Sequence, residues 1–107
     1  MPDLDAIVGA AADAAGIALD ATGARAVGGG CINVAWRVPG PDGAEFLKAN
    51  RASDRAMFEA EAAGLRSLRE AHALRVPEVL AVGLDAGSAW LLLEWIEPGR
   101  ADRRTEV

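Results

Sequence analysis

The sequence predicts an α+β domain in which two helices pack on one face of a five-stranded antiparallel sheet. Apolar residues recur with helical spacing in two segments, and the segments between them alternate apolar and polar residues. Glycine and proline clusters separate the alternating segments, as expected for strands joined by turns. With 107 residues, of which 51% are hydrophobic and 25% charged, the chain has the composition of one small globular domain.

Two segments have the apolar stripe of an amphipathic helix. The first covers residues 3–15 and is closed by Gly16, and its stripe consists of Leu4, Ile7, Val8, Ala11 and Ala15. The second covers residues 53–71 with Ser53 as its N-cap, and its stripe consists of Met57, Phe58, Ala62, Leu65 and Leu68. We expect each stripe to face the core.

Five segments have the pattern of strands. They cover residues 25–27, 32–38, 45–50, 76–82 and 90–96. Turn-forming residues fill 39–43 and 83–87, and Pro98-Gly99 ends the last strand. The order of the segments predicts an antiparallel meander, then the second helix, then two further strands.

The charge pattern excludes several classes of function. A net charge of -5 without a basic stripe argues against binding to nucleic acid, which depends on clustered Lys and Arg. No apolar run reaches the length that spans a membrane, and the N-terminus carries acids where a signal peptide carries positive charge. Cys31 is the only cysteine, so an intrachain disulfide is impossible, and we expect a cytoplasmic protein.

Three glycines, Gly28, Gly29 and Gly30, lie between the first two predicted strands. A dinucleotide-binding loop would have its third glycine at the position of Asn33 and a helix after it, but here an alternating strand pattern follows. A glycine turn between antiparallel strands can instead bring backbone N–H groups close to the phosphates of ATP. The alternative is a hairpin turn or bulge that binds no ligand.

A lysine and a glutamate help to decide between a phosphate-binding loop and a turn without a ligand. A kinase needs a lysine on a strand to bind the phosphates and a glutamate on the next helix to hold that lysine. Lys48 lies on the third predicted strand, although a strand lysine can also be a solvated edge residue. Glu61 falls on the apolar stripe of the second helix, whereas Glu59 falls on its opposite face. A carboxylate directed toward a core requires a partner, so we expect Glu61 to pair with Lys48.

The combination of GGGCIN, FLKAN, MFEAEAAGL, RVPEVLAVG and LLLEWIEPG resembles the N-terminal half of fructosamine (ketosamine-3-) kinases, relatives of aminoglycoside phosphotransferases. The resemblance covers about residues 20–99 and implies a protein-kinase-like N-terminal lobe over 1–99, with the second helix in the place of αC. It also implies ATP and Mg²⁺ as cofactors and a ketosamine sugar hydroxyl as phosphate acceptor. The nucleotide-binding residues that it implies are Gly28, Gly29, Gly30, Cys31, Ile32, Asn33, Lys48 and Glu61, with Leu93, Glu94, Trp95 and Ile96 as an adenine hinge.

We expect the catalytic half of such an enzyme to be absent from this chain. Asp102 is the only aspartate after the hinge, and His72 is not part of a His-Gly-Asp catalytic loop. We therefore expect no catalytic residue and no metal ligand in this chain, with 100–107 as a polar tail and the catalytic lobe absent. The chain is then either a piece of a ketosamine kinase, or a non-catalytic module that binds a nucleotide or a partner, or a fragment of another small-molecule kinase of the aminoglycoside phosphotransferase type.

Two further expectations follow from the missing lobe. The strand 90–96 and the underside of the meander should expose a continuous apolar surface to water, which favours self-association. Cys31 should be an accessible thiol beside the glycines, where oxidation could obstruct ATP, although a lone thiol can equally be inert.

Overall fold

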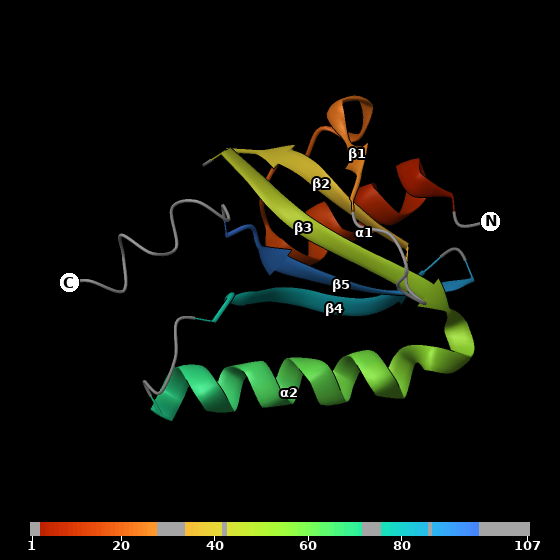
Figure 1. Cartoon of the computed structure of the whole chain (residues 1–107). Helices are drawn as coiled ribbons and strands as arrows, with labels where there is room; N and C mark the ends of the chain where they lie inside the picture. The colour runs from red at the N-terminus through yellow and green to blue at the C-terminus, as the bar shows by residue number, and fades with distance from the viewer. Residues whose placement is uncertain (1–2, 28–33, 42, 72–75, 86, 97–107) are drawn as a thin grey trace.

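A single five-stranded antiparallel sheet with strand order β1-β2-β3-β5-β4 forms the centre of the molecule (Figure 1). The computed structural model describes residues 3–27, 34–41, 43–71, 76–85 and 87–96. The helices are α1 (Leu4–Ala15) and α2 (Arg55–Ala71), and short 3₁₀ turns cover Ala21–Gly23 and Ala52–Asp54. The strands are β1 (Arg25–Ala26), β2 (Val34–Gly40), β3 (Gly43–Arg51), β4 (Val79–Asp85) and β5 (Ser88–Glu94). The predicted α+β fold class is confirmed.

The predicted limits of α1 are confirmed by its caps. The Asp3 carboxylate accepts a hydrogen bond of 3.3 Å from the backbone N–H of Ala6, and Gly16 ends the helix with a left-handed φ of 72°. The start of α2 differs from the prediction, because Ser53 lies inside a 3₁₀ turn and the helix begins at Arg55. Met57 and Leu68 are also exposed rather than buried, so the buried stripe of α2 is narrower than predicted.

The limits of the last two strands differ from the prediction. β4 covers Val79–Asp85 instead of residues 76–82, and β5 covers Ser88–Glu94 instead of residues 90–96. The physical reason lies in the pair Gly83 and Trp90, which face each other in the β4–β5 ladder. A Cβ atom on Gly83 would lie 2.6 Å from Cζ2 of Trp90, so the glycine leaves room for the indole ring and stays in the strand.

The two helices lie on opposite faces of the sheet, which corrects the prediction that both cover one face (Figure 1). One cluster of buried residues joins Ile7, Val8 and Ala11 of α1 to Leu47, Trp90 and Leu92 on one face. A second cluster joins Phe58 and Ala62 of α2 to Leu91 and Leu93 on the other face. The molecule is therefore a three-layer structure with a separate core on each side of the sheet.

The strand β5 is buried, although the sequence analysis expected it to be exposed to water. Trp90, Leu91, Leu92 and Leu93 are each at most 3% exposed. The prediction failed because β5 lies inside the sheet between β3 and β4, where both of its faces are covered by helices. β5 therefore offers no exposed apolar surface through which copies of this chain could associate.

The Gly83–Trp90 contact can be tested by substitution. We expect Gly83→Ala to lower the free energy of unfolding by about 1–3 kcal/mol, because the added methyl group overpacks a buried ring. Gly64→Ala is the matched control, since a Cβ atom on this exposed helical glycine meets nothing within 4 Å. It should raise stability by about 0.5–1 kcal/mol, and urea unfolding measures both effects. A Gly83→Ala variant as stable as the wild type would contradict the packing account.

Candidate functional site

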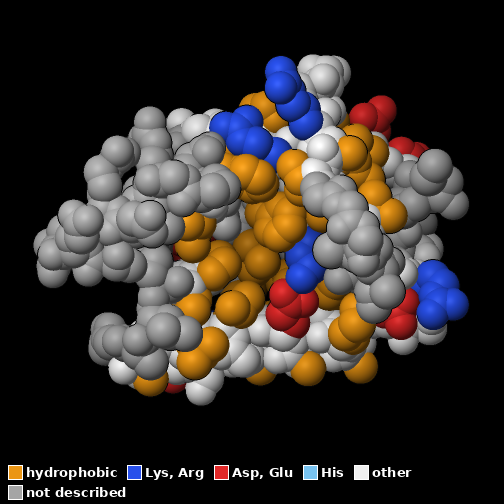
Figure 2. All heavy atoms as spheres, in the orientation of Figure 1, with side chains coloured by type: hydrophobic (Ala, Val, Ile, Leu, Met, Phe, Trp, Pro, Cys, Tyr) orange, Lys and Arg blue, Asp and Glu red, His pale blue; other side chains and the backbone are white. Residues whose placement is uncertain are grey.

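The face of the sheet that carries α2 is only partly covered by this helix. The residues that α2 buries belong mainly to β4 and β5, and the meander β1–β3 extends past it. Residues paired across a ladder point to the same face, so Arg37 and Phe46 lie on the same face as Lys48. Figure 2 shows hydrophobic side chains gathered over the middle of the sheet on this side, bordered by basic and acidic side chains.

Lys48 of β3 and Glu61 of α2 form an ion pair at the edge of this uncovered area. The distance from Lys48 Nζ to Glu61 Oε2 is 2.7 Å, and the two side chains are 16% and 33% exposed. Leu47 and Ala49 are buried on the opposite face, and the strand alternation therefore directs Lys48 toward α2. The predicted pairing of Lys48 with Glu61 is confirmed.

Glu59 has a different environment. Its carboxylate pairs with Arg55 one helical turn earlier at 2.8 Å, and these side chains are 50% and 53% exposed. It is therefore on the solvent side of α2, as the helical spacing predicted. The contrast follows from position on the helix, because Glu59 and Glu61 lie on opposite sides of the buried stripe of Phe58 and Ala62, and the Glu61 side faces Lys48.

The glycine segment connects neighbouring antiparallel strands. β1 pairs with β2 through Arg25↔Arg37 and Ala26↔Trp36, and the N–H of Val27 donates to the carbonyl of Ala35 at 2.9 Å. The predicted phosphate-binding residues Gly28, Gly29, Gly30, Cys31, Ile32 and Asn33 all lie outside the described residues. What the structure establishes is that the two strands on either side of them are adjacent and antiparallel.

The predicted hinge residues differ in their environments. Leu93 is buried against α2, and Glu94 ends β5. The N–H of Glu94 donates to the Glu78 carbonyl at 2.9 Å, and the Glu94 carboxylate accepts from the N–H of Glu78 at 3.2 Å. Of the two backbone groups of Glu94, a nucleotide base could therefore use at most the carbonyl. Trp95 and Ile96 follow the strand and are half-buried.

Two residues near the hinge were missed by the sequence analysis. The rings of Phe46 and Trp95 meet edge to face, with centroids 5.8 Å apart and planes at 74°. The guanidinium carbon of Arg37 lies 5.5 Å from the centroid of the Trp95 ring. Strand alternation could have placed Phe46 on the face of Lys48, but finding Arg37 there required the β2–β3 register.

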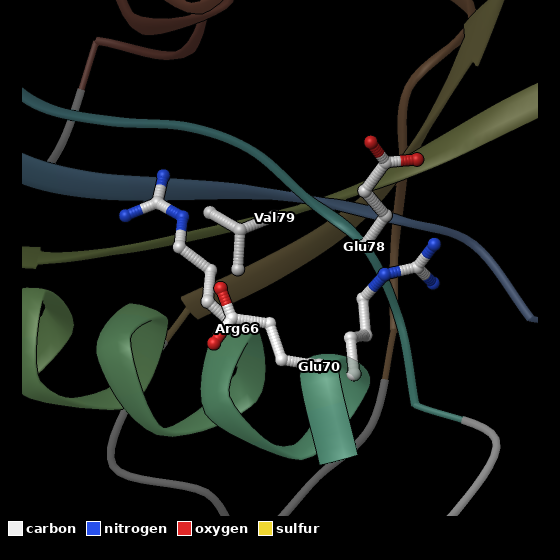
Figure 3. Close-up of a pocket in the computed structure, with 5 residues that line it drawn as sticks. Arg66, Glu70, Glu78 and Val79 are labelled. Carbon is white, nitrogen blue, oxygen red and sulfur yellow. The ribbon is translucent and has the colours of Figure 1, made fainter. Parts of the chain in front are cut away.

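A separate pocket lies at the C-terminal end of α2 and has a volume of about 250 Å³ (Figure 3). Its lining consists of Arg66, Arg69, Glu70, Glu78 and Val79. The two arginines and two glutamates of the lining give the pocket no net charge. Arg69 Nη1 donates a hydrogen bond of 3.4 Å to the carbonyl of Val76. Figure 3 shows Arg66 and Glu70 on the helix, with Glu78 pointing away from it. This mixed surface shares no residue with the ion pair, and it adjoins the hinge through Glu78 and Val79, which pair with Glu94 and Leu93.

Other kinds of site are not evident in the described part of the chain. No group of three His, Cys, Asp or Glu side chains there could hold a metal ion. Within the same residues, neither helix has the length and hydropathy needed to cross a membrane. The pKa of Asp20 is lowered by the Thr22 hydroxyl that donates to its carboxylate at 2.6 Å, and this exposed carboxylate lies far along the chain from Lys48.

The fold and the ion pair together define the class of protein. A five-stranded antiparallel sheet, with a lysine on its third strand paired to a glutamate on the following helix, is the N-terminal lobe of a protein-kinase-like fold. Comparison with known proteins then identifies the family. The fructosamine kinase profile matches residues 4–107, and the chain belongs to the fructosamine kinase family.

Individual relatives agree with this assignment. A probable ketoamine kinase of Synechocystis is 40% identical over 78 residues, which cover 73% of this chain and 26% of that protein. A chloroplastic protein-ribulosamine 3-kinase of Arabidopsis thaliana is 40% identical over 85 residues, 78% of this chain and 26% of its own length. A crystal structure from Haemophilus somnus, described as a fructosamine-3-kinase, superposes with a TM-score of 0.73 at 28% identity, covering 87% of this chain and 32% of that one. The chain thus spans about a quarter of the length of these curated relatives.

The two ion pairs of α2 provide an internal comparison. Double-mutant cycles with Lys48→Met and Glu61→Gln should give a coupling free energy of about 1 kcal/mol, because the pair is partly shielded from water. The cycle with Arg55→Met and Glu59→Gln should give about 0.3–0.5 kcal/mol, because that pair is half exposed. Urea unfolding at low and high salt measures both. Equal couplings, or a Lys48–Glu61 coupling abolished by salt, would contradict this ranking.

Proposed function

We propose that this chain binds ATP and forms the nucleotide-binding lobe of an enzyme that transfers the γ-phosphate to a sugar hydroxyl of a ketosamine. The observation that carries the proposal is the Lys48–Glu61 ion pair at the border of an uncovered sheet face. The family membership of the chain supports the same chemistry. The ketosamine acceptor is taken from the family and from relatives such as the protein-ribulosamine 3-kinase, and it is either protein-bound or small.

Each residue of the proposed site has a distinct task. The Lys48 ammonium holds phosphate oxygens, and Glu61 keeps it at the phosphate position instead of in bulk water. The backbone N–H groups of residues 28–33 cover the phosphates, and the Glu94 carbonyl and the Ile96 N–H bind the adenine edge. ATP fits this set of residues, since Lys48 supplies a positive charge that water and ligands can reach. Mg²⁺, which neutralises the phosphates when bound, takes its ligands from outside the described residues.

The catalytic half of the reaction lies outside this chain in our proposal. Residues 1–99 form the nucleotide-binding lobe and 100–107 follow the hinge, while the rest of the relatives' length supplies the residues that activate the acceptor hydroxyl. The isolated chain is then inactive in phosphoryl transfer, and it works in the cytoplasm, joined to or beside the missing lobe. A non-catalytic module that binds a nucleotide or a partner is the second candidate, and it would use the same Lys48–Glu61 pair.

Nucleotide binding provides the direct test of this proposal. We expect the 107-residue chain to bind ATP weakly, and Lys48→Met to weaken that binding at least about tenfold because the charge facing the phosphates is lost. Glu59→Gln is the control and should leave affinity unchanged, since this side chain points to solvent. Isothermal titration calorimetry measures both.

Two outcomes would decide against the proposal. A wild-type chain that binds no ATP at millimolar concentration would refute nucleotide binding, and equal ATP affinity in Lys48→Met would refute the role of the lysine. A purified chain that phosphorylates a ketosamine unaided would refute the division into a binding lobe and a separate catalytic lobe.

The glycine segment can be tested through its neighbouring thiol. We expect saturating ATP to slow the alkylation of Cys31 at least about threefold, because a nucleotide held under residues 28–33 shields the adjacent sulfur. Mass spectrometry of the labelled chain measures the rate, and the Lys48→Met variant should need at least about tenfold more ATP for the same protection. Equal labelling rates with and without ATP in the wild type would show that the nucleotide is not covered near Cys31.

A further inference from the structure

Arg37, Phe46 and Trp95 form a cluster that the roles proposed above leave unexplained. Phe46 and Arg37 face each other across the β2–β3 ladder, and both side chains contact the Trp95 ring, one edge to face and one as a cation over the ring. Phe46 precedes Lys48 by two residues on the same face, a separation of about 7 Å along the strand. The cluster therefore lies beside the ion pair, on the side of the hinge.

Trp95 occupies the position where the backbone of β5 leaves the sheet. The ladder between β3 and β5 begins at the pair Glu45↔Glu94, and Glu94 is fixed to Glu78 by a hydrogen bond in each direction. Trp95 is the first residue after this anchor, so the contacts of its indole ring help set the direction of the backbone that follows. A change in the ring position would move the peptide groups of Trp95 and Ile96.

We propose that Arg37 is a positioning residue for the nucleotide base. It holds the Trp95 ring against Phe46, and thereby fixes the peptide groups at 94–96 that bind the base edge. This inference rests on the proposed ATP-binding function and extends it to residues on β2 and β3. Arg37 does not need to touch the nucleotide, because its guanidinium group acts on the indole ring.

The geometry favours this role over direct phosphate binding. Lys48 is paired with a carboxylate on α2, whereas the guanidinium carbon of Arg37 lies 5.5 Å from the centroid of an aromatic ring. A planar guanidinium group stacks on an aromatic face and loses little freedom in doing so. Removing Arg37 should therefore affect the recognition of the base and leave the recognition of the phosphates intact.

Base recognition can be separated from phosphate recognition by comparing two ligands of the 107-residue chain. ATP carries both the base and the phosphates, whereas inorganic tripolyphosphate carries the phosphates alone. We expect Arg37→Met to raise the dissociation constant for ATP about threefold to tenfold, as loss of a cation–π contact implies, and to leave that for tripolyphosphate unchanged. Arg37→Lys should recover part of the ATP affinity because it keeps a cation on the ring. Arg25→Met is the matched control, since Arg25 is paired with Arg37 in the β1–β2 register and shares its face. It removes the same charge and should change neither constant.

A second measurement does not require the Arg37→Met variant to fold. The indole N–H signal of Trp95, assigned with Trp95→Phe, should shift in the wild-type chain when ATP is added and stay in place when tripolyphosphate is added. Three outcomes would overturn this inference and leave the proposed function intact. Arg37→Met could weaken the binding of ATP and tripolyphosphate equally, or it could leave ATP binding unchanged. The third outcome is an indole N–H signal that does not shift when ATP is added. A wild-type chain that binds neither ligand would overturn the proposed function, and this inference with it.

Discussion

Burial of β5 on both faces is the constraint on which the rest of the structure depends. Residues Ala89–Leu93 are all apolar, so neither side of this strand can face water without a large loss of stability. Its place between β3 and β4 covers both backbone edges, and the two helices cover its two faces. Because the alternate residues belong to different cores, α1 and α2 must lie on opposite sides of the sheet. The layered architecture thus follows from one short segment.

The same constraint determines where a site can form. α2 is placed over β4 and β5 by Phe58 and Ala62, which leaves the neighbouring face of β2 and β3 uncovered. Burial of one side chain the size of Phe58 contributes about 1.5–3 kcal/mol, compared with about 1 kcal/mol or less for a partly exposed ion pair. Apolar packing therefore sets the position of the helix, and the Lys48–Glu61 pair forms because that position brings Glu61 next to Lys48. Lys48 lies at the border because its neighbours Leu47 and Ala49 are buried on the other face.

Local periodicity made the helices and the ion pair predictable from the sequence. Glu61 could be distinguished from Glu59 because helical spacing alone decides which of them points inward, and the structure agrees. The faces of the sheet were not predictable in this way, since they depend on which strand lies beside which. The extension of β4 through Gly83 depends on the Trp90 ring across the ladder, and a glycine in a sequence otherwise indicates a turn. The Arg37–Trp95 contact likewise joins residues 58 positions apart and required the register of three strands.

Affinity for a nucleotide and the rate of phosphoryl transfer would be separable quantities in such a lobe. The groups that this chain could offer a nucleotide are one held ammonium group, backbone N–H groups and an aromatic surface, and in our proposal these contact the nucleotide and not the acceptor hydroxyl. Acceleration requires groups whose interactions strengthen as the phosphoryl group moves, above all a residue that orients the acceptor hydroxyl. Substitutions at Lys48, Arg37 or Trp95 should then act on nucleotide affinity in the isolated chain. Under the proposed function, their effect on turnover should appear only together with the residues that activate the acceptor hydroxyl.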